Sequence, residues 1–415
     1  MTISQILFLI VLIIVFREAV IRYGRLIRNI NLGRDDEVIN NKGGFKRMML
    51  VAFGQQKMFK KPLPALLHLF IYVAFVITQF DLTEQIIDGI FGTHRVLSSV
   101  LGGFYPFMIS FIEILSVFAF IATIAFLSRR NLLKVPRLNS KDLLGWAKLD
   151  ANLILIGEIL LITGIFCLNG ADKALEANYP AKYHATGFFA MTGWLGPALF
   201  GNLPEYYLQI ISGFGWWLHI AVVFGFILYL PTSKHLHILL AFPNTYLSSD
   251  NPRGRMSNIE SIESEVKNMI GVPMTHPIKE TLADFGVHDI FQLTRKNLLE
   301  AYSCTECGRC TSVCPANMTG KKLSPRKIMM DVRDRMEEVG RKLDDPDFTS
   351  IAGDIDNKIG FNDGRDLVNY IEKEEIRACT TCNACVEACP VLISPLEIIL
   401  QLRRYEVLTE SSGPP

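Results

Sequence analysis

Eight of the nine cysteines fall in two short runs that share one spacing. Each run reads C-x2-C-x2-C-x3-C-P, a pattern in which three cysteines hold one [4Fe–4S] cluster and the fourth ligates the other cluster. This rule predicts that one cluster is bound by Cys304, Cys307, Cys310 and Cys389. It predicts that the second cluster is bound by Cys379, Cys382, Cys385 and Cys314.

The alternative interpretation of these runs is a pair of structural zinc sites, which also use C-x-x-C spacing. Zinc sites rarely repeat four cysteines so compactly with a proline after the last, so the pattern favours clusters. A disulfide framework does not fit such tight spacing. Clusters of this kind transfer electrons.

Histidines form the second group of residues that could do chemistry, because several lie within or beside long apolar segments. Ionisable residues inside a membrane are functional by default, and two histidines from different helices can hold a b-type haem. The main candidates are His68, His219 and His237. His219 and His237 are 18 residues apart, or about 27 Å along one helix. A single helix, bent at Pro231, would therefore place one ligand at each membrane face.

Three further histidines are weaker candidates. His235 lies two residues before His237 and could be an interfacial residue instead of a ligand. His94 and His184 lie in loops outside the apolar segments, where a histidine is more often an ordinary polar residue. Each of these two could still ligate an outer haem. For His68 and His219 the alternative is a buried structural histidine, which is costly inside a bilayer without a partner.

The elements that must position these residues are membrane helices. Five segments are apolar for about the 20 residues that a bilayer requires: 3–22, 62–81, 103–127, 151–170 and 207–230. The segment 185–201 is short and broken by glycine and proline, which favours an interfacial or re-entrant piece. The N-terminus lacks the features of a cleaved signal, so its apolar run is expected to be a retained helix.

Lysine and arginine in the loops predict the orientation. Eleven lie between Arg17 and Lys61 and six between Arg129 and Lys148, whereas the other loops hold only Arg95, Lys173 and Lys182. Basic loops stay in the cytoplasm. We therefore expect a multi-pass protein of the inner membrane of a prokaryote, with its C-terminal domain in the cytoplasm.

The fold class predicted is all-α, a five-helix transmembrane bundle followed by an α-helical, ferredoxin-like dicluster domain. Expected limits are 1–240 for the membrane domain, 241–290 for a linker, 291–405 for the cluster domain and 406–415 for a tail. Helices are predicted at Leu293 to Tyr302 and at Pro325 to Val339, with no strand. The insert from Pro315 to Ala378 is expected to cover the clusters and offer a docking face.

Composition narrows the classes of function. Half of the residues are hydrophobic and the formal net charge is +1, so charge balance suggests no nucleic-acid surface. The Gly-Gly pairs at 43–44 and 102–103 lack the strand–helix context of a nucleotide loop, which argues against flavin or NAD binding.

The membrane half resembles the cytochrome b subunit of respiratory nitrate reductase and its relatives in membrane heterodisulfide reductase. The resemblance rests on Gly-Gln-Gln-Lys (54–57), Leu-Leu-His68-Leu-Phe, Trp-Trp-Leu-His219 and Ser-Lys-His235-Leu-His237 with Pro243-Asn244 after it. The C-terminal half resembles the small iron–sulfur subunit of heterodisulfide reductase. By resemblance, one or two b haems lie between the second and fifth spans, and His68 and His237 hold the inner one.

Two departures from the family stand out. His219 matches the ligand of the outer haem, but Thr78 stands where its partner would be, so His94 or His184 would have to replace it. Fused relatives also carry Cys-Cys-Gly repeats for thiol chemistry, and this sequence has no Cys-Cys pair. The chain is thus expected to relay electrons without a complete catalytic site of its own, apart from a quinone site.

The leading hypothesis is an oxidoreductase subunit that relays electrons between the quinone pool, haem b and two clusters. Its cytoplasmic partner would be a Cys-Cys-Gly-type iron–sulfur protein or an electron-transfer flavoprotein. A second hypothesis is a membrane anchor and docking module of a heterodisulfide-reductase-like complex, with mainly structural clusters. A third, a thiol–disulfide reductase in its own right, is disfavoured by the missing repeats.

Overall fold

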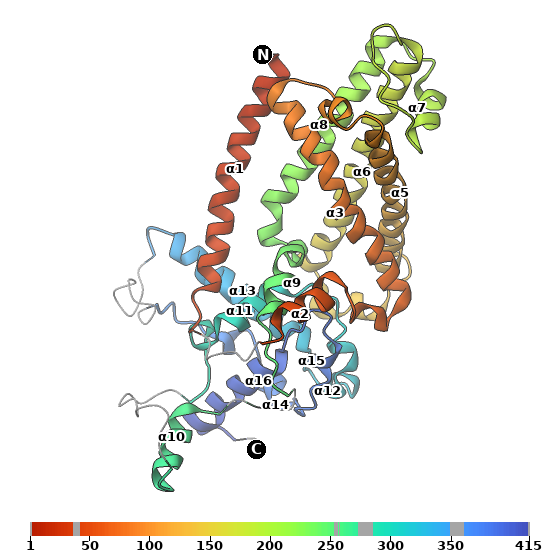
Figure 1. Ribbon diagram of the computed structural model, residues 1–415. Coiled ribbons are helices and arrows are strands. Elements are labelled where there is room, and N and C mark those ends of the chain that lie inside the picture. Colours follow the sequence, from red (N-terminus) through yellow and green to blue (C-terminus); the bar gives the residue numbers. More distant parts are fainter. Residues whose placement is uncertain are drawn as a thin grey trace. The chain divides into compact units, whose positions relative to one another are not determined.

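The chain is helical throughout the part that the computed structural model describes, which is residues 2–35, 42–252, 256, 258–272, 285–348 and 361–413. These residues form no strand beyond one isolated bridge between Arg34 and Thr294. The predicted all-α class is confirmed (Figure 1). The chain divides into two compact units, Met1–Tyr23 with Met58–Ser233, and Gly24–Lys57 with Lys234–Pro415. The domain limits expected from the sequence stay predictions.

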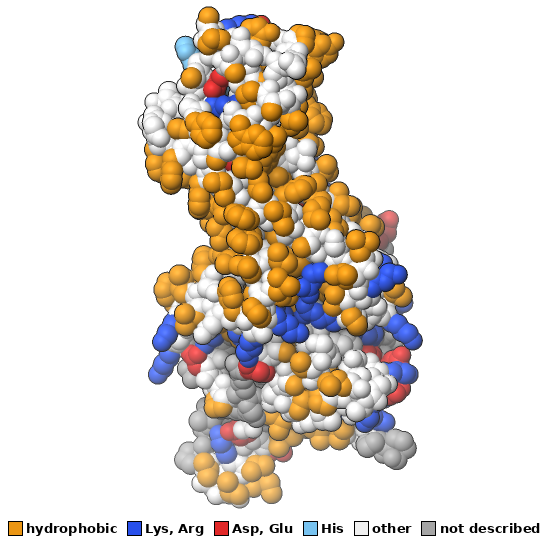
Figure 2. All heavy atoms as spheres, turned by 90° about the vertical axis from the view of Figure 1, so that its right-hand side faces the viewer, with side chains coloured by type: hydrophobic (Ala, Val, Ile, Leu, Met, Phe, Trp, Pro, Cys, Tyr) orange, Lys and Arg blue, Asp and Glu red, His pale blue; other side chains and the backbone are white. Residues whose placement is uncertain are grey.

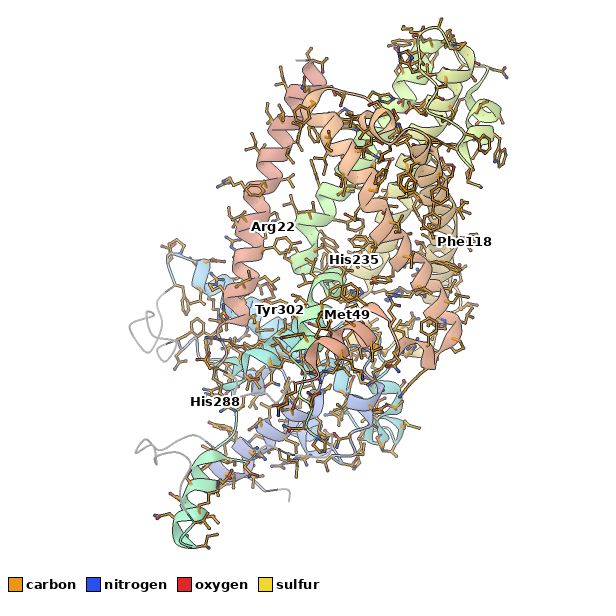
Figure 3. The ribbon with its side chains drawn as sticks, in the orientation of Figure 1. Arg22, Met49, Phe118, His235, His288 and Tyr302 are labelled. Carbon is orange, nitrogen blue, oxygen red and sulfur yellow. The ribbon has the colours of Figure 1, made fainter. Side chains whose placement is uncertain are left out.

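Five long helices are apolar enough to cross a membrane. They are α1 (Ile3–Ile30), α3 (Pro62–Phe91), α5 (Phe104–Asn131), α6 (Trp146–Asn178) and α8 (Glu205–Tyr229). Apolar side chains cover their outer surfaces, as Figure 2 shows for one face. The exposed Phe118 of α5, labelled in Figure 3, stacks on Phe70 of α3 at 4.9 Å between ring centroids. The five spans expected from the sequence are present, so the chain is a membrane protein.

Each helix is longer than the apolar segment that predicted it, because hydrogen bonding and capping set the ends of a helix, whereas apolar length reflects the bilayer. Helix α3, for example, continues to Phe91 and is closed by Gly92 in the left-handed conformation, with φ 69°. The N–H of Gly92 donates to the Asp88 carbonyl at 2.8 Å, a common way to end a helix. Helix α5 ends with Arg129 and Arg130 in its last turn, where positive charge is favourable.

Short elements connect the long helices of the first unit. They are η2 (Met58–Lys60), α4 (Val96–Leu101), η3 (Pro136–Leu138), η4 (Lys141–Leu143), α7 (Thr192–Phe200) and η5 (Leu230–Thr232). Helix α7 has nine residues, too few to cross a bilayer. The segment 185–201 is accordingly not among the helices that could span.

Helices α6 and α8 approach closely through glycines. A Cβ atom on Gly215 of α8 would lie 2.4 Å from the backbone nitrogen of Leu168, and one on Gly164 of α6 would lie 2.9 Å from that of His219. Small residues at such contacts allow membrane helices to pack backbone to backbone. This contact holds His219 against α6.

A buried polar network ties one end of the first unit together. Arg95 donates to Asp172 at 2.9 Å and to Asn169 at 2.5 Å, both on α6. Glu113 of α5 accepts from the side chain of Asn169 at 3.1 Å and from the backbone N–H of Met191 at 2.8 Å. Buried charges need such partners, and here the partners join α5, α6 and the loops.

The structure corrects one expectation about the histidines. Helix α8 ends at Tyr229, the 3-10 turns η5 and η6 (Lys234–Leu236) follow, and α9 (His237–Tyr246) begins at His237. His219 and His237 therefore lie on different helices and in different compact units. Pro231 cannot donate the backbone hydrogen bond that would continue α8, so the axial distance expected for one helix does not apply.

The second unit is built from shorter helices. They are α2 (Gly44–Met48), η1 (Met49–Phe53), α9, α10 (Glu260–Met269), η7 (Ile290–Gln292), α11 (Arg295–Ser303), η8 (Thr311–Val313), α12 (Pro315–Met318), α13 (Pro325–Asp344), η9 (Leu367–Asn369), α14 (Lys373–Arg377), α15 (Ala384–Ala388), α16 (Pro395–Arg404) and η10 (Tyr405–Thr409). Helices α11 and α13 confirm the two predicted from the sequence. Both have side-chain caps, Thr294 for α11 and Ser324 for α13.

The core of the second unit is apolar, with buried cations among the apolar side chains. Fully buried side chains from α11, α13 and α16, such as Leu298, Ile328 and Ile398, pack there. Arg335 of α13 is also fully buried, and it donates to Asp289 at 2.7 Å and to Asp363 at 2.8 Å. The cysteine loops begin or end at helices α11, α12 and α15, since Cys304 follows α11, Cys314 precedes α12 and Cys389 follows α15.

Candidate functional site

The two cysteine loops have the same backbone conformation. Glu306 and Thr381, each two residues after the first cysteine of its motif, have φ of 53° and 56°. Gly308 and Asn383, two residues further on, have φ of 70° and 61°. Positive φ is uncommon outside glycine and a genuine outlier for a β-branched residue such as threonine. The repeated motif therefore imposes a repeated and strained loop.

This loop aims backbone N–H groups at sulfur. The Thr381 N–H donates to Cys379 Sγ at 3.4 Å, and the Glu306 N–H makes the equivalent bond to Cys304. The Ile393 N–H donates to Cys389 Sγ at 3.3 Å. Such bonds stabilise negative charge on cluster sulfurs and tune the reduction potential.

The fold brings the cysteines together across the motifs. Cys304 interacts electrostatically with Cys307 and with Cys389, which is the last cysteine of the other motif. Cys310 interacts with Cys304, Cys307 and Cys389, and also with Cys385 of the second motif. The thiols of the first group therefore come from both runs.

The second group mirrors the first. Cys385 interacts electrostatically with Cys379, Cys382 and Cys314, the last of which belongs to the first motif. Two groups of four thiols, each with one member exchanged, are the arrangement that cross-ligation requires. The assignment of the eight ligands stays a prediction, which this grouping supports.

The chemistry of these thiols fits clusters. Burial raises the pKa of Cys304, Cys385 and Cys389 to about 12, and the neighbouring cysteines add to the rise. Bound iron would supply the positive charge that thiolates need in this environment. Among the described residues, no three His, Cys, Asp or Glu side chains converge as ligands of one metal ion would. A cubane does not require that convergence, because each cysteine binds a different iron.

A buried ion cluster lies beside the first cysteine loop. Glu306 accepts from Lys234 at 2.5 Å and from Arg333 of α13 at 2.8 Å, and its side chain is 2% exposed. Burial opposes charge on Glu306, but Arg333 and Lys234 outweigh it and lower the pKa of this carboxyl. Lys234 is the residue before His235. The cluster therefore connects the histidine segment with the loop that holds Cys304 and Cys307.

His237 has the bonding expected of a metal ligand. Its Nδ1 lies 3.1 Å from the Lys234 carbonyl oxygen. A ring that donates from Nδ1 presents Nε2 to a metal, and such donation orients most metal-bound histidines. Burial lowers the pKa of His237, which favours the neutral, ligating form. His235, labelled in Figure 3, lies 5.9 Å away between ring centroids.

A second set of contacts fixes α9 to the iron–sulfur helices. Lys296 of α11 donates to Asn244 of α9 and to Glu300 of α11, both at 2.6 Å. Glu300 accepts from the Ser394 N–H at 3.0 Å, and Asn244 donates to the Val391 carbonyl at 2.7 Å. These bonds hold the helix that begins at His237 against the loop that follows Cys389.

His219 is the histidine with the clearest sign of a missing ligand. Its side chain in α8 is 1% exposed, and Nδ1 has no hydrogen-bond partner among the described residues. Buried polar atoms are nearly always paired. The charged group that interacts with it is Asp81 of α3, not a second histidine.

The other candidate histidines belong to the first unit. His68 is half-buried in the second turn of α3. His94 Nε2 lies 3.1 Å from Asp172 Oδ2, and its side chain is 60% exposed. His184 is exposed in the segment before α7. In the described part of the chain, the charged partner of His219 is an aspartate and none of these three.

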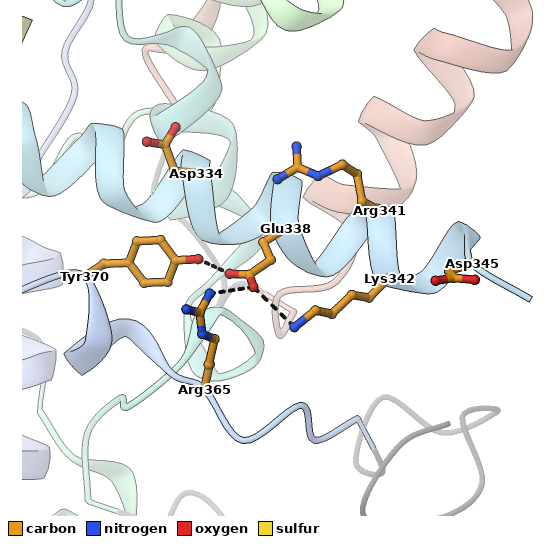
Figure 4. Close-up of a pocket in the computed structure, with 7 residues that line it drawn as sticks. All are labelled: Asp334, Glu338, Arg341, Lys342, Asp345, Arg365 and Tyr370. Atoms are coloured by element: carbon orange, nitrogen blue, oxygen red, sulfur yellow. Dashed lines mark hydrogen bonds and ion pairs between the residues drawn. The ribbon is translucent and has the colours of Figure 1, made fainter. Parts of the chain in front are cut away.

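The insert between the motifs carries an open hollow of about 620 Å³. Charged residues of α13 line it, together with Arg365 and Tyr370 (Figure 4). At its centre Glu338 accepts from Tyr370, from Arg365 at 2.8 Å and from Lys342 at 3.2 Å. Its polarity suits a protein surface, not an apolar redox ligand.

Sequence reasoning missed two sets of residues. Lys234 and Glu306 lie inside motifs that the sequence shows, but nothing in the sequence pairs them with each other or with Arg333. Acidic residues inside the membrane helices, such as Glu113 and Asp172, did carry a signal. Ionisable groups in apolar segments are functional hypotheses whatever their type, whereas the prediction from the sequence used only the histidines among them.

Residues 303–393, which include all eight clustered cysteines, match the 4Fe-4S dicluster domain family. FadF of Bacillus subtilis (strain 168), a probable iron-sulfur-binding oxidoreductase, is 29% identical over 382 residues. The match covers 86% of this chain and 49% of FadF. The EtfAB:quinone oxidoreductase of Syntrophomonas wolfei is 26% identical over 382 residues, which cover 88% of this chain and 49% of that protein.

A probable membrane-anchored ferredoxin of Chromohalobacter salexigens is 34% identical over 138 residues, 32% of this chain and 20% of that protein. The chain spans about half the length of FadF and of the Syntrophomonas protein. No solved structure matches it significantly. The chain is therefore a membrane protein with a [4Fe–4S] dicluster domain, similar to iron–sulfur oxidoreductases.

Proposed function

We propose that this chain is the electron-transfer subunit of a membrane oxidoreductase, relaying electrons between a membrane quinone, haem b and two [4Fe–4S] clusters. The observation that supports the proposal is the electrostatic contact of Cys389 with Cys304 and of Cys314 with Cys385, each between the two motifs. Two clusters held in this way lie close together in one rigid unit. Such a pair serves to pass electrons.

The contacts of the second unit suggest an order for the relay. The group with Cys304 is joined to the His237 segment through Lys234 and Glu306, so its cluster would exchange electrons with the haem. The loop that holds Cys379, Cys382 and Cys385 is exposed at Cys382. The cluster bound there would therefore face the partner. The charged hollow on α13 offers a docking surface of the kind that a soluble partner requires.

The haem proposal rests on the resemblance and on His237. The contact of its Nδ1 with the Lys234 carbonyl is the orientation that suits a histidine bound to iron through Nε2, and by the resemblance His68 would supply the second ligand. A second haem would use His219, with His94 or His184 opposite. Because Nε2 of His94 is engaged by Asp172 and His184 is exposed, the proposed function is stated for one haem.

The names of the relatives favour one class of partner. The Syntrophomonas relative is named for quinone and for EtfAB. We therefore propose an electron-transfer flavoprotein as the soluble partner, ahead of a Cys-Cys-Gly iron–sulfur protein. The excess of lysine and arginine in two of the loops favours a cytoplasmic partner.

Anaerobic redox titration of the purified protein tests the haem. We expect the optical bands of a bis-histidine b haem in the wild type and their loss in His68→Ala, with the cluster signals kept. The matched control is Thr78→Ala on the same helix, where the exposed hydroxyl bonds only to the Phe75 carbonyl. A wild-type protein without haem bands would contradict the haem proposal and leave the clusters untouched.

Quinol addition separates the relay from the anchor hypothesis. Under anaerobic conditions a quinol analogue should reduce the clusters of the wild type, as measured by electron paramagnetic resonance. Clusters that dithionite reduces but no quinol does would favour a membrane anchor with structural clusters.

A further inference from the structure

A cavity of about 230 Å³ lies in the first unit, at one end of its helices. Its walls come from the start of α1, the end of α3 with the following loop, and α8. They include Gln5, Phe8, His94, Ser212 and Trp216. None of these residues is a ligand of the one haem or of the clusters in the proposed relay. The cavity is larger than the roughly 150 Å³ that accommodates benzene, so a ligand of one or two rings would fit.

One side of the cavity is aromatic. Phe8 of α1 and Trp216 of α8 lie 5.3 Å apart between ring centroids, and Trp217 meets Trp216 edge-on at 5.0 Å. Trp217 Nε1 lies 3.3 Å from Ser4 Oγ, which fixes its ring. Flat apolar faces of this kind bind a flat conjugated ring.

The other side is polar and ordered by Asp172. This carboxylate accepts from Ser212 at 2.7 Å, from Arg95 at 2.9 Å and lies 3.1 Å from His94 Nε2. To donate to Asp172, His94 must carry its proton on Nε2. The neutral ring then accepts a hydrogen bond at Nδ1, whereas the protonated ring donates one. Nδ1 of His94 can therefore accept a hydrogen bond from a ligand hydroxyl or donate one to a ligand carbonyl oxygen at the same position.

The cavity also lies near His219. Trp216 is three residues before His219 on α8, so the two residues are about one helical turn apart, roughly 4.5 Å along the axis. His219 is the buried histidine whose Nδ1 has no partner in the described part of the chain. A ring against Trp216 would therefore lie about one helical turn from His219 along α8.

We propose that this cavity binds the head group of a membrane quinone, with His94 bonded to a quinone oxygen and the ring against Trp216. A quinone has both features that the walls would bind. It has a flat apolar ring, and it has an oxygen that is a carbonyl in one redox form and a hydroxyl in the other. The proposal rests on the proposed function, which requires a quinone but does not locate it.

A substitution that fills the cavity tests the proposal. Gly213 lines the cavity, and a Cβ atom added there would meet no atom within 4 Å. Gly213→Leu would therefore add a bulky side chain at the cavity wall with no clash at its Cβ atom, and leucine is a good helix former. The matched control is Gly225→Leu on the same helix, where an added Cβ also meets nothing within 4 Å and which does not line the cavity.

The first readout is binding of menadione, measured as quenching of tryptophan fluorescence in the purified full-length protein. We expect Gly213→Leu to weaken binding at least tenfold and Gly225→Leu to behave as wild type. His94→Gln, which leaves the cavity open, should weaken binding severalfold. Equal binding by wild type and Gly213→Leu would overturn the site.

The second readout is reduction of the clusters by a short-chain menaquinol, with dithionite as the reference reductant. Gly213→Leu should slow reduction by quinol at least tenfold and leave reduction by dithionite unchanged. Full quinol reduction in Gly213→Leu would refute the site while the relay stands. If quinol fails to reduce even the wild type, the relay itself is wrong, so the two failures are distinguishable.

Discussion

At the scale of single residues, the site depends on pairs that the fold brings together. Glu306 lies between two cysteines of the first motif, and its charge is held by Lys234 and Arg333. A buried carboxylate of this kind is stable only while both cations remain. Charges this close to a cluster would influence its reduction potential as well as its position.

Exchange of Cys314 and Cys389 leads to a prediction that spectroscopy can check. Cys389→Ser should disturb the same cluster as Cys307→Ser, although Cys389 belongs to the other motif. Each substitution should remove or convert one of the two clusters, and so up to roughly half of the bound iron. Electron paramagnetic resonance of the two variants should give the same residual spectrum.

Cys382→Ser should give a different residual spectrum, and Cys167→Ser should match the wild type, because Cys167 lies apart in α6. If the Cys389→Ser spectrum matches that of Cys382→Ser, ligation stays within each motif and the exchange is wrong.

At the scale of elements, α13 lies in the insert between the two cysteine motifs and holds its unusual charges. Lys327 donates to Asp331 at 2.7 Å and to Glu375 of α14 at 2.9 Å. Two carboxylates thus share one lysine in a largely buried place. Burial raises the pKa of Asp331 to about 7; Lys327 lowers it, and Glu375 adds to the rise.

This shift predicts how stability depends on pH. The pKa of Asp331 is about 7 in the folded state and about 3.9 in the unfolded chain. Between these values the folded state binds more protons, so the free energy of unfolding falls as pH rises. Asp331→Asn cannot lose a proton. Its melting temperature should exceed that of the wild type by about 3 °C or more at pH 8, with the difference vanishing near pH 4.

Thermal loss of the visible absorbance of the clusters measures this difference. The control is Asp347→Asn, an exposed position in the same insert, which should follow the wild-type curve. An Asp331→Asn variant no more stable than wild type at pH 8 would show that Lys327 keeps Asp331 ionised.

At the scale of the whole molecule, the chain combines five membrane helices with a dicluster domain. Seventeen basic residues lie in two connections, Arg17 to Lys61 and Arg129 to Lys148. This asymmetry predicts a cytoplasmic C-terminal domain. An epitope tag at the C-terminus should be cleaved by added protease in inverted membrane vesicles and protected in right-side-out vesicles. The opposite result would reverse the orientation and place the clusters outside.

The sequence alone determined the features that depend on neighbouring residues. The eight cysteines, the five apolar spans and helices α11 and α13 follow from spacing and periodicity, which are local signals. The exchange of Cys314 and Cys389 is a prediction of the same kind, because the motif itself implies it.

Only the tertiary structure decided which distant residues meet. Lys234 and Glu306 are 72 residues apart, and no local pattern pairs them. The separation of His219 and His237 onto two helices depended on how the chain turns after Tyr229, where a proline allows either a kink or an end. The cavity at His94 depended on α1, α3 and α8 meeting at one end. Such contacts arise from packing in three dimensions. Residue types and their spacing along the sequence do not specify each of these contacts.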